Sequence, residues 1–218
     1  MLDVRIVLEL CAFLLFLAGW VGYERYHTAR TRQRPGATRY GRLLARQAHW
    51  IDAVVARDEP LFPVHTLRTL SRQASFLGSL ALLAVGGAFG LLLSSERFQA
   101  LCEVTRLFGH PSYRLLQLKM LVLVAVLAYA FLAFVWGVRA LLAAHLFTAG
   151  LDGEEAALTA GLRRYLGDFQ LDFRHGLRGA YYGVDLMVWL FSTELFIVAT
   201  IALTIFLARY DLAREADA

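Results

Sequence analysis

The chain has 218 residues, of which 58% are hydrophobic and 18% are charged, and its formal net charge is +4. This composition excludes an ordinary soluble domain, because such domains carry about 25% charged residues and fewer apolar ones. The two cysteines, Cys11 and Cys102, are too few for a disulfide framework, and no pattern supports their pairing. We expect a single membrane domain over residues 1–218.

Four apolar runs are long enough to cross a bilayer, since about 20 apolar residues bridge a hydrocarbon core of roughly 30 Å. They cover approximately residues 6–23, 76–94, 120–138 and 184–208. The first run is followed by no small-residue cleavage site, so we expect an anchor helix and not a signal peptide. The predicted fold class is an all-α integral membrane protein, with four transmembrane helices and amphipathic cytoplasmic helices.

The distribution of arginine predicts how the chain is oriented. Segment 24–74 contains ten arginines and segment 148–183 contains four, whereas loop 95–112 contains two. Positively charged loops stay in the cytoplasm. We therefore expect a multi-pass protein of the cell (inner) membrane, with segments 24–74 and 148–183 cytoplasmic and both termini outside.

A basic amphipathic helix is predicted over residues 40–57. Its apolar face carries Leu43, Leu44, Trp50, Ile51, Val54 and Val55, and its basic face includes Arg42, Arg46 and Arg57. Such a helix beside a span is typical of an interfacial helix whose arginines contact anionic lipid headgroups. Packing against the cytoplasmic end of the bundle is the alternative, and the two are compatible. A nucleic-acid partner is not expected, because the basic face is short and adjoins the membrane.

The second span carries a face of small residues. A helix is expected to begin near Val64 and to run into this span, where Gly86 and Gly90, and likewise Ala84 and Ala88, are four residues apart. Small residues at this spacing let helices approach closely. Packing within the chain is the favoured interpretation, and contact with a second copy is the alternative.

Charged residues inside the spans are expected to form pairs. Glu9 has two candidate partners, Arg5 one turn before it and Lys119 at the same depth on the third span. On the cytoplasmic side, Arg139 and Asp185 are predicted to lie at matching depths and to pair.

Glu194 is predicted to lie near the middle of the last span, with no basic residue at its level. A carboxyl group at that depth is a candidate functional site. Three interpretations remain open: a neutral hydrogen-bonding clamp, a residue in a proton or ion path, and a contact with another subunit. The intramembrane polar site proposed from the sequence therefore comprises Glu194, Glu9 and Lys119.

Sequence signatures of chemistry are absent. Asp168, Asp172 and His175 share one helix face, which permits metal binding, but with Arg164 they fit a salt-bridged surface equally well. No histidine lies at a span centre, as haem ligation would require. The chain has no phosphate-binding glycine loop, no nucleophile elbow and no zinc-protease motif. We expect no catalytic residue, cofactor or metal.

Several motifs resemble one membrane protein family. They are Arg46-Gln-Ala-His-Trp50, Val64-His-Thr-Leu-Arg68 before a glycine-rich span, Gly176-Leu-Arg178-Gly-Ala-Tyr181-Tyr182 before an aromatic span, and Leu-Ala-Arg209-Tyr-Asp211-Leu near the end. In this order the motifs resemble the family called domain of unknown function 599, over roughly residues 30–212. The resemblance implies a multi-pass membrane fold and no known reaction, cofactor or substrate.

The chain departs from the family pattern at two places. Thr69 stands where the family usually has asparagine, and no proline lies near Ser192–Glu194, where the family tends to have one. Three functions remain: a structural or accessory subunit of a homo-oligomer or larger membrane complex, a small oligomeric channel or transporter using Glu194, and a membrane enzyme. The first is preferred.

Overall fold

The computed structural model describes residues 2–55, 61–106, 112–149 and 155–212, which form helices joined by short turns and no strand. The helices are α1 (Leu2–Leu17), α2 (Tyr23–Gln33), α3 (Arg39–Val55), α4 (Leu61–Leu93), α5 (Ser95–Arg106), α6 (Tyr113–Ala149), α7 (Glu155–Phe191) and α8 (Thr193–Leu212). A π-helical turn, Ala18–Gly22, joins α1 to α2 without a break in the helix. The predicted all-α class is confirmed.

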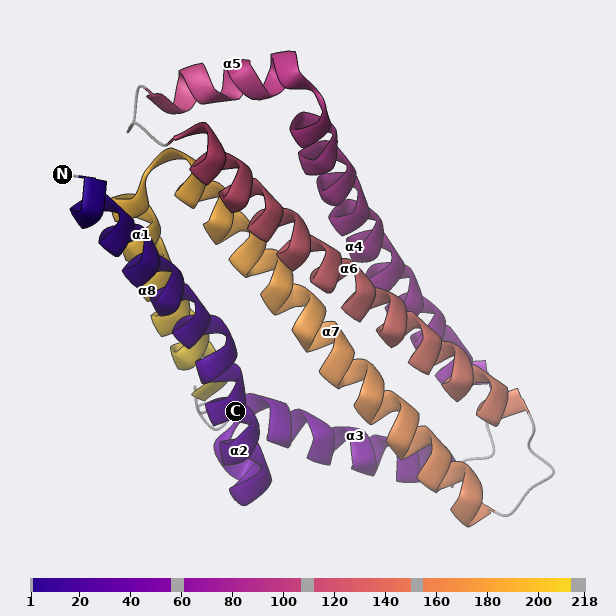
Figure 1. Cartoon of the computed structure of the whole chain (residues 1–218). Coiled ribbons are helices and arrows are strands. Elements are labelled where there is room, and N and C mark those ends of the chain that lie inside the picture. Colours follow the sequence, from indigo (N-terminus) through magenta and orange to yellow (C-terminus); the bar gives the residue numbers. More distant parts are fainter. Residues whose placement is uncertain (1, 56–60, 107–111, 150–154, 213–218) are drawn as a thin grey trace.

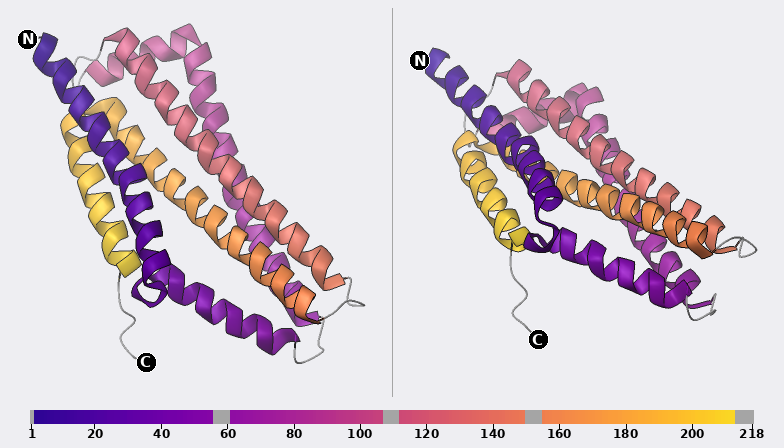
Figure 2. Two further views of the ribbon diagram at one scale, coloured as in Figure 1. Left: turned by 60° about the horizontal axis from the view of Figure 1, so that its bottom comes forward. Right: turned by 90° about the horizontal axis from the view of Figure 1, so that it is seen from below.

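Four helical segments are long and apolar enough to cross a membrane, as the sequence predicted. They are Val4–Gln33, His65–Leu93, Tyr113–Leu146 and Thr193–Leu212. The amphipathic helix predicted over 40–57 is α3, which lies across the lower end of the bundle (Figure 2). The short helix α5 lies across the opposite end (Figure 1).

The prediction of one continuous helix over 184–208 is wrong. The helix ends at Phe191, the chain turns at Ser192, and α8 returns antiparallel beside α7 (Figure 1). The Ser192 hydroxyl accepts a hydrogen bond from the Leu195 amide at 3.2 Å. This is the geometry of a helix N-cap, which provides an acceptor for an amide that has no partner within the helix.

This break makes five long helices traverse the bundle. Helices α1, α6 and α8 run in one direction, and α4 and α7 run in the other (Figure 1). Glu9 of α1 contacts Thr193 at the start of α8, and Tyr23 at the start of α2 contacts Asp211 at the end of α8, so the continuous α1–α2 helix and α8 are parallel. The first described residue, Leu2, and the last, Leu212, therefore lie at opposite ends. We expected both termini on one side of the membrane because four spans were predicted. That prediction did not include α7, which also runs the length of the bundle.

The core has an upper and a lower part. The upper part is rich in aromatic residues from α1, α7 and α8, including Phe16, Tyr182 and Phe196. The lower part joins α3 to α4, α6 and α7, and Ile51 of α3 is 1% exposed there. Helix α3 thus packs against the bundle, in agreement with one of its two predicted placements.

The small residues of α4 point in two directions. Ala81 and Ala88 are buried, but Gly86 and Gly90 are exposed, and a Cβ atom built on either would meet no atom within 4 Å. Of the predicted alanine pair, Ala88 lies in the core and Ala84 is partly buried against it, so both pack within the chain as expected. Gly86 and Gly90 do not.

Glycines permit a close helix approach between α6 and α7. A Cβ atom on Gly176 would lie 2.7 Å from the Phe134 ring, and one on Gly179 would lie 2.9 Å from the Cβ of Ala130 and 3.2 Å from its Cα. Small residues in α7 therefore let the two longest helices pack against each other.

Replacing Gly179 by valine should lower the free energy of unfolding by about 1–3 kcal/mol, because the new side chain would overlap the backbone of Ala130. The matched control is Gly167→Val on the same helix, where nothing lies within 4 Å of the added Cβ. Both substitutions place a β-branched residue in α7, so helix propensity cancels in the comparison. Unfolding by denaturing detergent measures the difference, and equal stability of the two variants would refute this packing argument.

Candidate functional site: a polar seam between α1, α7 and α8

Polar and charged side chains follow the line where the α1–α2 helix, α7 and α8 meet. We call this line the polar seam and divide it into three levels. The upper level contains Glu9, Lys119, Trp189 and Thr193; the middle level contains Gly19, Tyr182, Asp185, Thr200 and Thr204; the lower level contains Tyr23, Glu24, His27, Arg174, His175, Arg178 and Asp211. Such residues inside a membrane bundle are candidates for function.

The upper level is a hydrogen-bonded ion pair. The Nζ atom of Lys119 lies 2.8 Å from Oε1 of Glu9, which confirms the predicted cross-helix pair and leaves Arg5 as the unused alternative. The two Glu9 oxygens also accept hydrogen bonds from Trp189 Nε1 and Thr193 Oγ1, both at 2.7 Å. Lys119 further donates to the Trp189 carbonyl at 3.0 Å. This carbonyl belongs to the last turn of α7, where helices present acceptors without partners.

The hydrogen bonds of the middle level join oxygen atoms to oxygen atoms. The hydroxyl of Tyr182 donates to the carbonyl of Gly19 at 2.7 Å, within the π-helical turn. The hydroxyl of Thr200 donates to Oδ2 of Asp185 at 2.7 Å. A Cβ atom on Gly19 would lie 2.7 Å from the Thr204 hydroxyl, so only glycine permits this approach of α1 to α8.

Glu24 is the centre of the lower level. Its Oε1 atom lies 2.5 Å from Arg174 Nη2 and 3.2 Å from His175 Nε2, and its Oε2 atom pairs with Arg178. Arg178 also pairs with Asp211 of α8, which accepts a hydrogen bond from the Tyr23 hydroxyl at 3.0 Å. Two guanidinium groups thus face two carboxylates, and the network joins α2, α7 and α8.

His27 completes this network and is 1% exposed. Arg174 Nη1 lies 2.7 Å from its Nδ1 atom. A guanidinium group only donates hydrogen bonds, so Nδ1 must accept and the ring is neutral. The Nε2 atom then carries the hydrogen and lies 3.7 Å from Asp211.

The network reaches α3 through an aromatic ring. The guanidinium carbon of Arg174 lies 4.5 Å from the centroid of the Tyr40 ring, within the range of cation–π attraction. Burial raises the pKa of the Tyr40 phenol, so the ring stays neutral beside this cation. The lower level therefore ties the horizontal helix α3 to the bundle.

Glu194 lies outside the polar seam. It is exposed in the first turn of α8, and its carboxylate accepts a hydrogen bond from the Ser192 hydroxyl at 2.8 Å. The prediction that Glu194 lies near the middle of a span is wrong, because the chain turns two residues before it. An acidic residue in this first turn is stabilised by the helix dipole.

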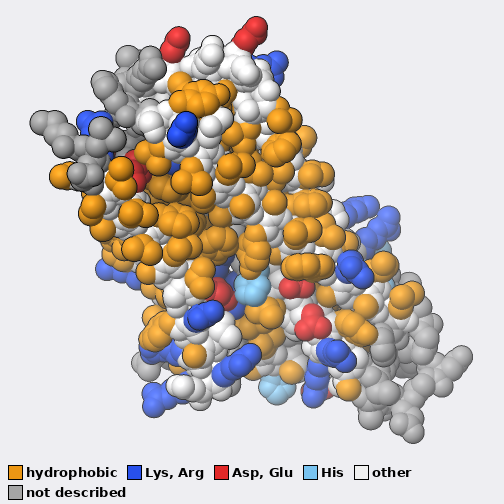
Figure 3. Space-filling model, in the orientation of Figure 1, with side chains coloured by type: hydrophobic (Ala, Val, Ile, Leu, Met, Phe, Trp, Pro, Cys, Tyr) orange, Lys and Arg blue, Asp and Glu red, His pale blue; other side chains and the backbone are white. Residues whose placement is uncertain are grey.

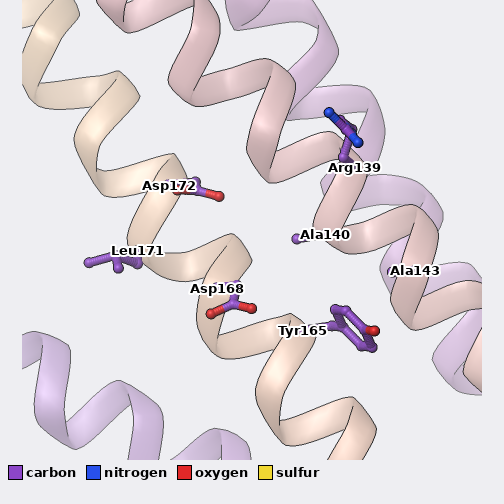
Figure 4. A pocket seen from close by; sticks show the side chains of 7 residues that line it. All are labelled: Arg139, Ala140, Ala143, Tyr165, Asp168, Leu171 and Asp172. Atoms are coloured by element: carbon purple, nitrogen blue, oxygen red, sulfur yellow. The ribbon is translucent and has the colours of Figure 1, made fainter.

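The predicted pair of Arg139 and Asp185 does not form. Asp185 is buried against Thr200 in the polar seam, whereas Arg139 lines a shallow pocket between α6 and α7 (Figure 4). The prediction assumed that residues after Gly183 start a new helix from the cytoplasmic side. They are instead the last turns of α7, which rises away from that side.

The shallow pocket has a volume of about 350 Å³ and is lined by Arg139, Ala140, Ala143, Tyr165, Asp168, Leu171 and Asp172 (Figure 4). Asp168 and Asp172 both line this pocket, in agreement with their predicted place on one helix face. His175 instead contacts Glu24 in the polar seam. Within the described ranges, no group of three histidine, cysteine or acidic side chains could hold a metal ion.

Two of the three arginines predicted to contact lipid, Arg42 and Arg46, lie on α3. Arg46 is exposed and Arg42 is partly buried, with one guanidinium nitrogen 3.2 Å from the carbonyl of Gly36. Arg57 lies outside the described residues. In the space-filling view, basic side chains gather toward this end of the molecule and hydrophobic side chains cover its middle (Figure 3). Cys11 and Cys102 do not form a disulfide with each other.

Sequence reasoning missed the lower level. Glu24, His27 and Asp211 were not singled out as site residues, and His175 was considered only on one helix face with Asp168 and Asp172. A usable signal existed, since Glu24 directly follows the first span and Arg178 directly precedes the apolar half of α7. Matching depths would have paired them if α7 had been counted as a crossing helix.

Comparison with known proteins gives one match. A family model described as "Protein of unknown function, DUF599" matches residues 11–216. No curated protein and no solved structure matches the chain.

Proposed function

We propose that this chain, which belongs to the DUF599 family of proteins of unknown function, is a structural or accessory subunit of a membrane assembly and associates with copies of itself through α4. One observation carries this proposal: Gly86, Gly87 and Gly90 of α4 face away from the rest of the described chain and leave open space beside the helix. Small residues at a helix surface permit close packing of a second helix in lipid.

The outer face of α4 has the pattern of a helix-pairing surface. Phe76, Ser79, Leu83, Gly86 and Gly90 follow one another at spacings of three and four residues, and all five are exposed. The stripe combines two large side chains, those of Phe76 and Leu83, with three small residues, and the Ser79 hydroxyl donates a hydrogen bond to the Ser75 carbonyl one turn earlier. Residues at this spacing line one face of a helix. The leucine and phenylalanine of one copy would fit over the glycines of another.

The position of α4 in the fold supports the same proposal. Helix α4 packs against α6 on one side and forms an edge of the bundle (Figures 1 and 2). The polar seam lies on the other side of the bundle and stabilises the fold independently. Association through α4 would therefore leave the seam intact.

The orientation that we propose follows from the charges at the two ends. The lower end carries α2, α3 and the first turns of α4 and α7, which contain most of the arginines. The positive-inside rule places this end in the cytoplasm of the cell (inner) membrane. With five crossings, residue 2 then lies outside and residue 212 lies in the cytoplasm. Arg42 and Arg46 of α3 lie at this end, where anionic lipid headgroups would meet them.

The self-association proposal predicts that Gly86→Leu and Gly90→Leu abolish the oligomer without unfolding the chain. The Cβ atom of either leucine would meet no described atom of the monomer within 4 Å, so the loss would come from the contact between copies. The control is Ala202→Leu, which adds a similar side chain on the exposed face of α8. Mass measurement of complexes released from lipid nanodiscs reports the copy number. A monomeric native chain, or an oligomer that is unchanged in both glycine variants, would refute the proposal. A foreign protein bound at α4 in place of a second copy would refute self-association through this helix.

A small channel or transporter is the second candidate. The residue that favours it is Asp185 and no longer Glu194, because Asp185 is a buried carboxyl group of the middle level without an ion-pair partner among the described residues.

A further inference from the structure

Asp185 is the most deeply buried of the carboxyl groups along the polar seam. The residue is 4% exposed. Its Oδ2 atom accepts the hydrogen bond from Thr200, but its Oδ1 atom is buried and has no hydrogen-bond partner in the described part of the chain. By contrast, the carboxylates of the other levels each contact at least one basic side chain.

The ionisable groups around Asp185 are few. Tyr182 lies one turn away on α7, Glu9 and Lys119 belong to the upper level, and Tyr23 belongs to the lower level. Between Glu194 and Arg209, α8 contains no ionisable residue. No described side chain forms an ion pair with Asp185.

A bare carboxylate in this position is energetically costly. An ionised carboxyl group in an apolar interior pays a large desolvation cost unless it is paired or hydrogen-bonded, and Thr200 provides only one hydrogen bond. A small cation bound at Oδ1 removes this cost by neutralising the group. The other polar atoms in the hydrogen bonds of the middle level are oxygens of Thr200, Thr204, Tyr182 and Gly19, and oxygen is the element that suits a proton or an alkali-metal ion.

We propose that Asp185 is a binding site for one monovalent cation, H⁺ or Na⁺, between α7 and α8 in the middle of the bundle. Membrane proteins use buried acidic residues of this kind as proton-relay and ion-coupling sites. The proposal is independent of association through α4, since it concerns a site inside one chain.

The test measures unfolding of the purified chain in detergent as pH and sodium concentration vary. Ionisation of Asp185 is costlier in the folded chain than in the unfolded one, so native stability should fall as pH rises. Relative to Asp185→Asn, the unfolding constant should grow by up to about tenfold per pH unit, which is the limit for one proton. If the site also accepts sodium, NaCl should restore stability at high pH when choline chloride does not.

Asp168→Asn is the matched control, because it makes the same change on the same helix at an exposed position. If the stability difference between the wild-type chain and Asp185→Asn depends on pH alone, Asp185 binds a proton. If that difference also depends on sodium concentration, a proton and a sodium ion compete for the same site. Stability differences that depend on neither pH nor sodium would overturn the proposal.

A second measurement needs no substitution at Asp185. In a native chain labelled with ¹³C-aspartate, infrared absorption should show a protonated carboxyl band in an apolar environment, and this band should disappear as pH rises or sodium binds. A spectrum without such a band and without any response to sodium would refute the site even if Asp185→Asn failed to fold.

Discussion

Replacing Arg178 by alanine is expected to lower the free energy of unfolding by about 3–5 kcal/mol, the usual cost of removing one partner of a buried ion pair. Arg178 is 4% exposed and pairs with both Glu24 and Asp211. Its loss leaves two carboxylates facing each other without their shared cation. The effect should exceed that of any other single substitution in the lower level, because this side chain joins α2, α7 and α8 at once.

Unfolding by denaturing detergent, followed through helix content and tryptophan fluorescence, measures this loss. Arg163→Ala is the matched control, since Arg163 also pairs with a carboxylate, that of Asp52, but both side chains are about half exposed. Exposed ion pairs contribute at most about 1 kcal/mol. Arg178→Lys should recover only part of the stability, because a single ammonium group does not reproduce a guanidinium fork between two carboxylates. Equal losses in Arg178→Ala and Arg163→Ala would contradict the role assigned to the lower level.

Replacing Lys119 by methionine should cost about 3–5 kcal/mol for a related reason, since it leaves Glu9 without a counter-charge near the other end of the bundle. Methionine keeps much of the apolar length of lysine, so the loss would report mainly on charge. The Trp189 carbonyl also loses its hydrogen bond from Lys119.

A double-mutant cycle with Glu9→Gln separates the ion pair from the other contacts. Glutamine keeps an acceptor for Trp189 Nε1 and Thr193 Oγ1 but carries no charge. The Lys119→Met/Glu9→Gln chain should therefore be more stable than Lys119→Met alone, with a coupling energy of about 0.5–3 kcal/mol. Strictly additive losses would show that the two charges do not depend on each other.

The sequence identified Glu9 as a candidate contact of Lys119 but did not identify the contacts of Arg178. The pair of Glu9 and Lys119 was predicted because each residue interrupts an apolar run at a similar depth, and depth is a local property of a span. The lower level depends on α7, whose first half carries too many charges to be recognised as part of a span. The two carboxylates that pair with Arg178 of α7, those of Glu24 and Asp211, are 187 positions apart, and no local sequence pattern connects them.

The break at Ser192 had a signal that apolar length concealed. Serine followed by an acidic residue in the next turn is a typical helix start. The proline that the family tends to have near this position points to the same break, because proline is tolerated in the first turn of a helix and disrupts its interior. Hydropathy outweighed both signals, since residues 184–208 are almost uniformly apolar.

The sequence by itself determined the membrane class, the four apolar segments, the amphipathic helix α3 and the family. These features follow from composition and periodicity, which act over one helix at a time. Only the tertiary structure decided that Glu9 pairs with Lys119 and not with Arg5, that α7 runs the length of the bundle, and that residues 2 and 212 lie at opposite ends of it. It also decided that Asp185, and not Glu194, is the buried carboxyl group without an ion-pair partner among the described residues. A single turn at Ser192 reverses the direction of every residue after it, and the contacts that result join residues far apart in the chain.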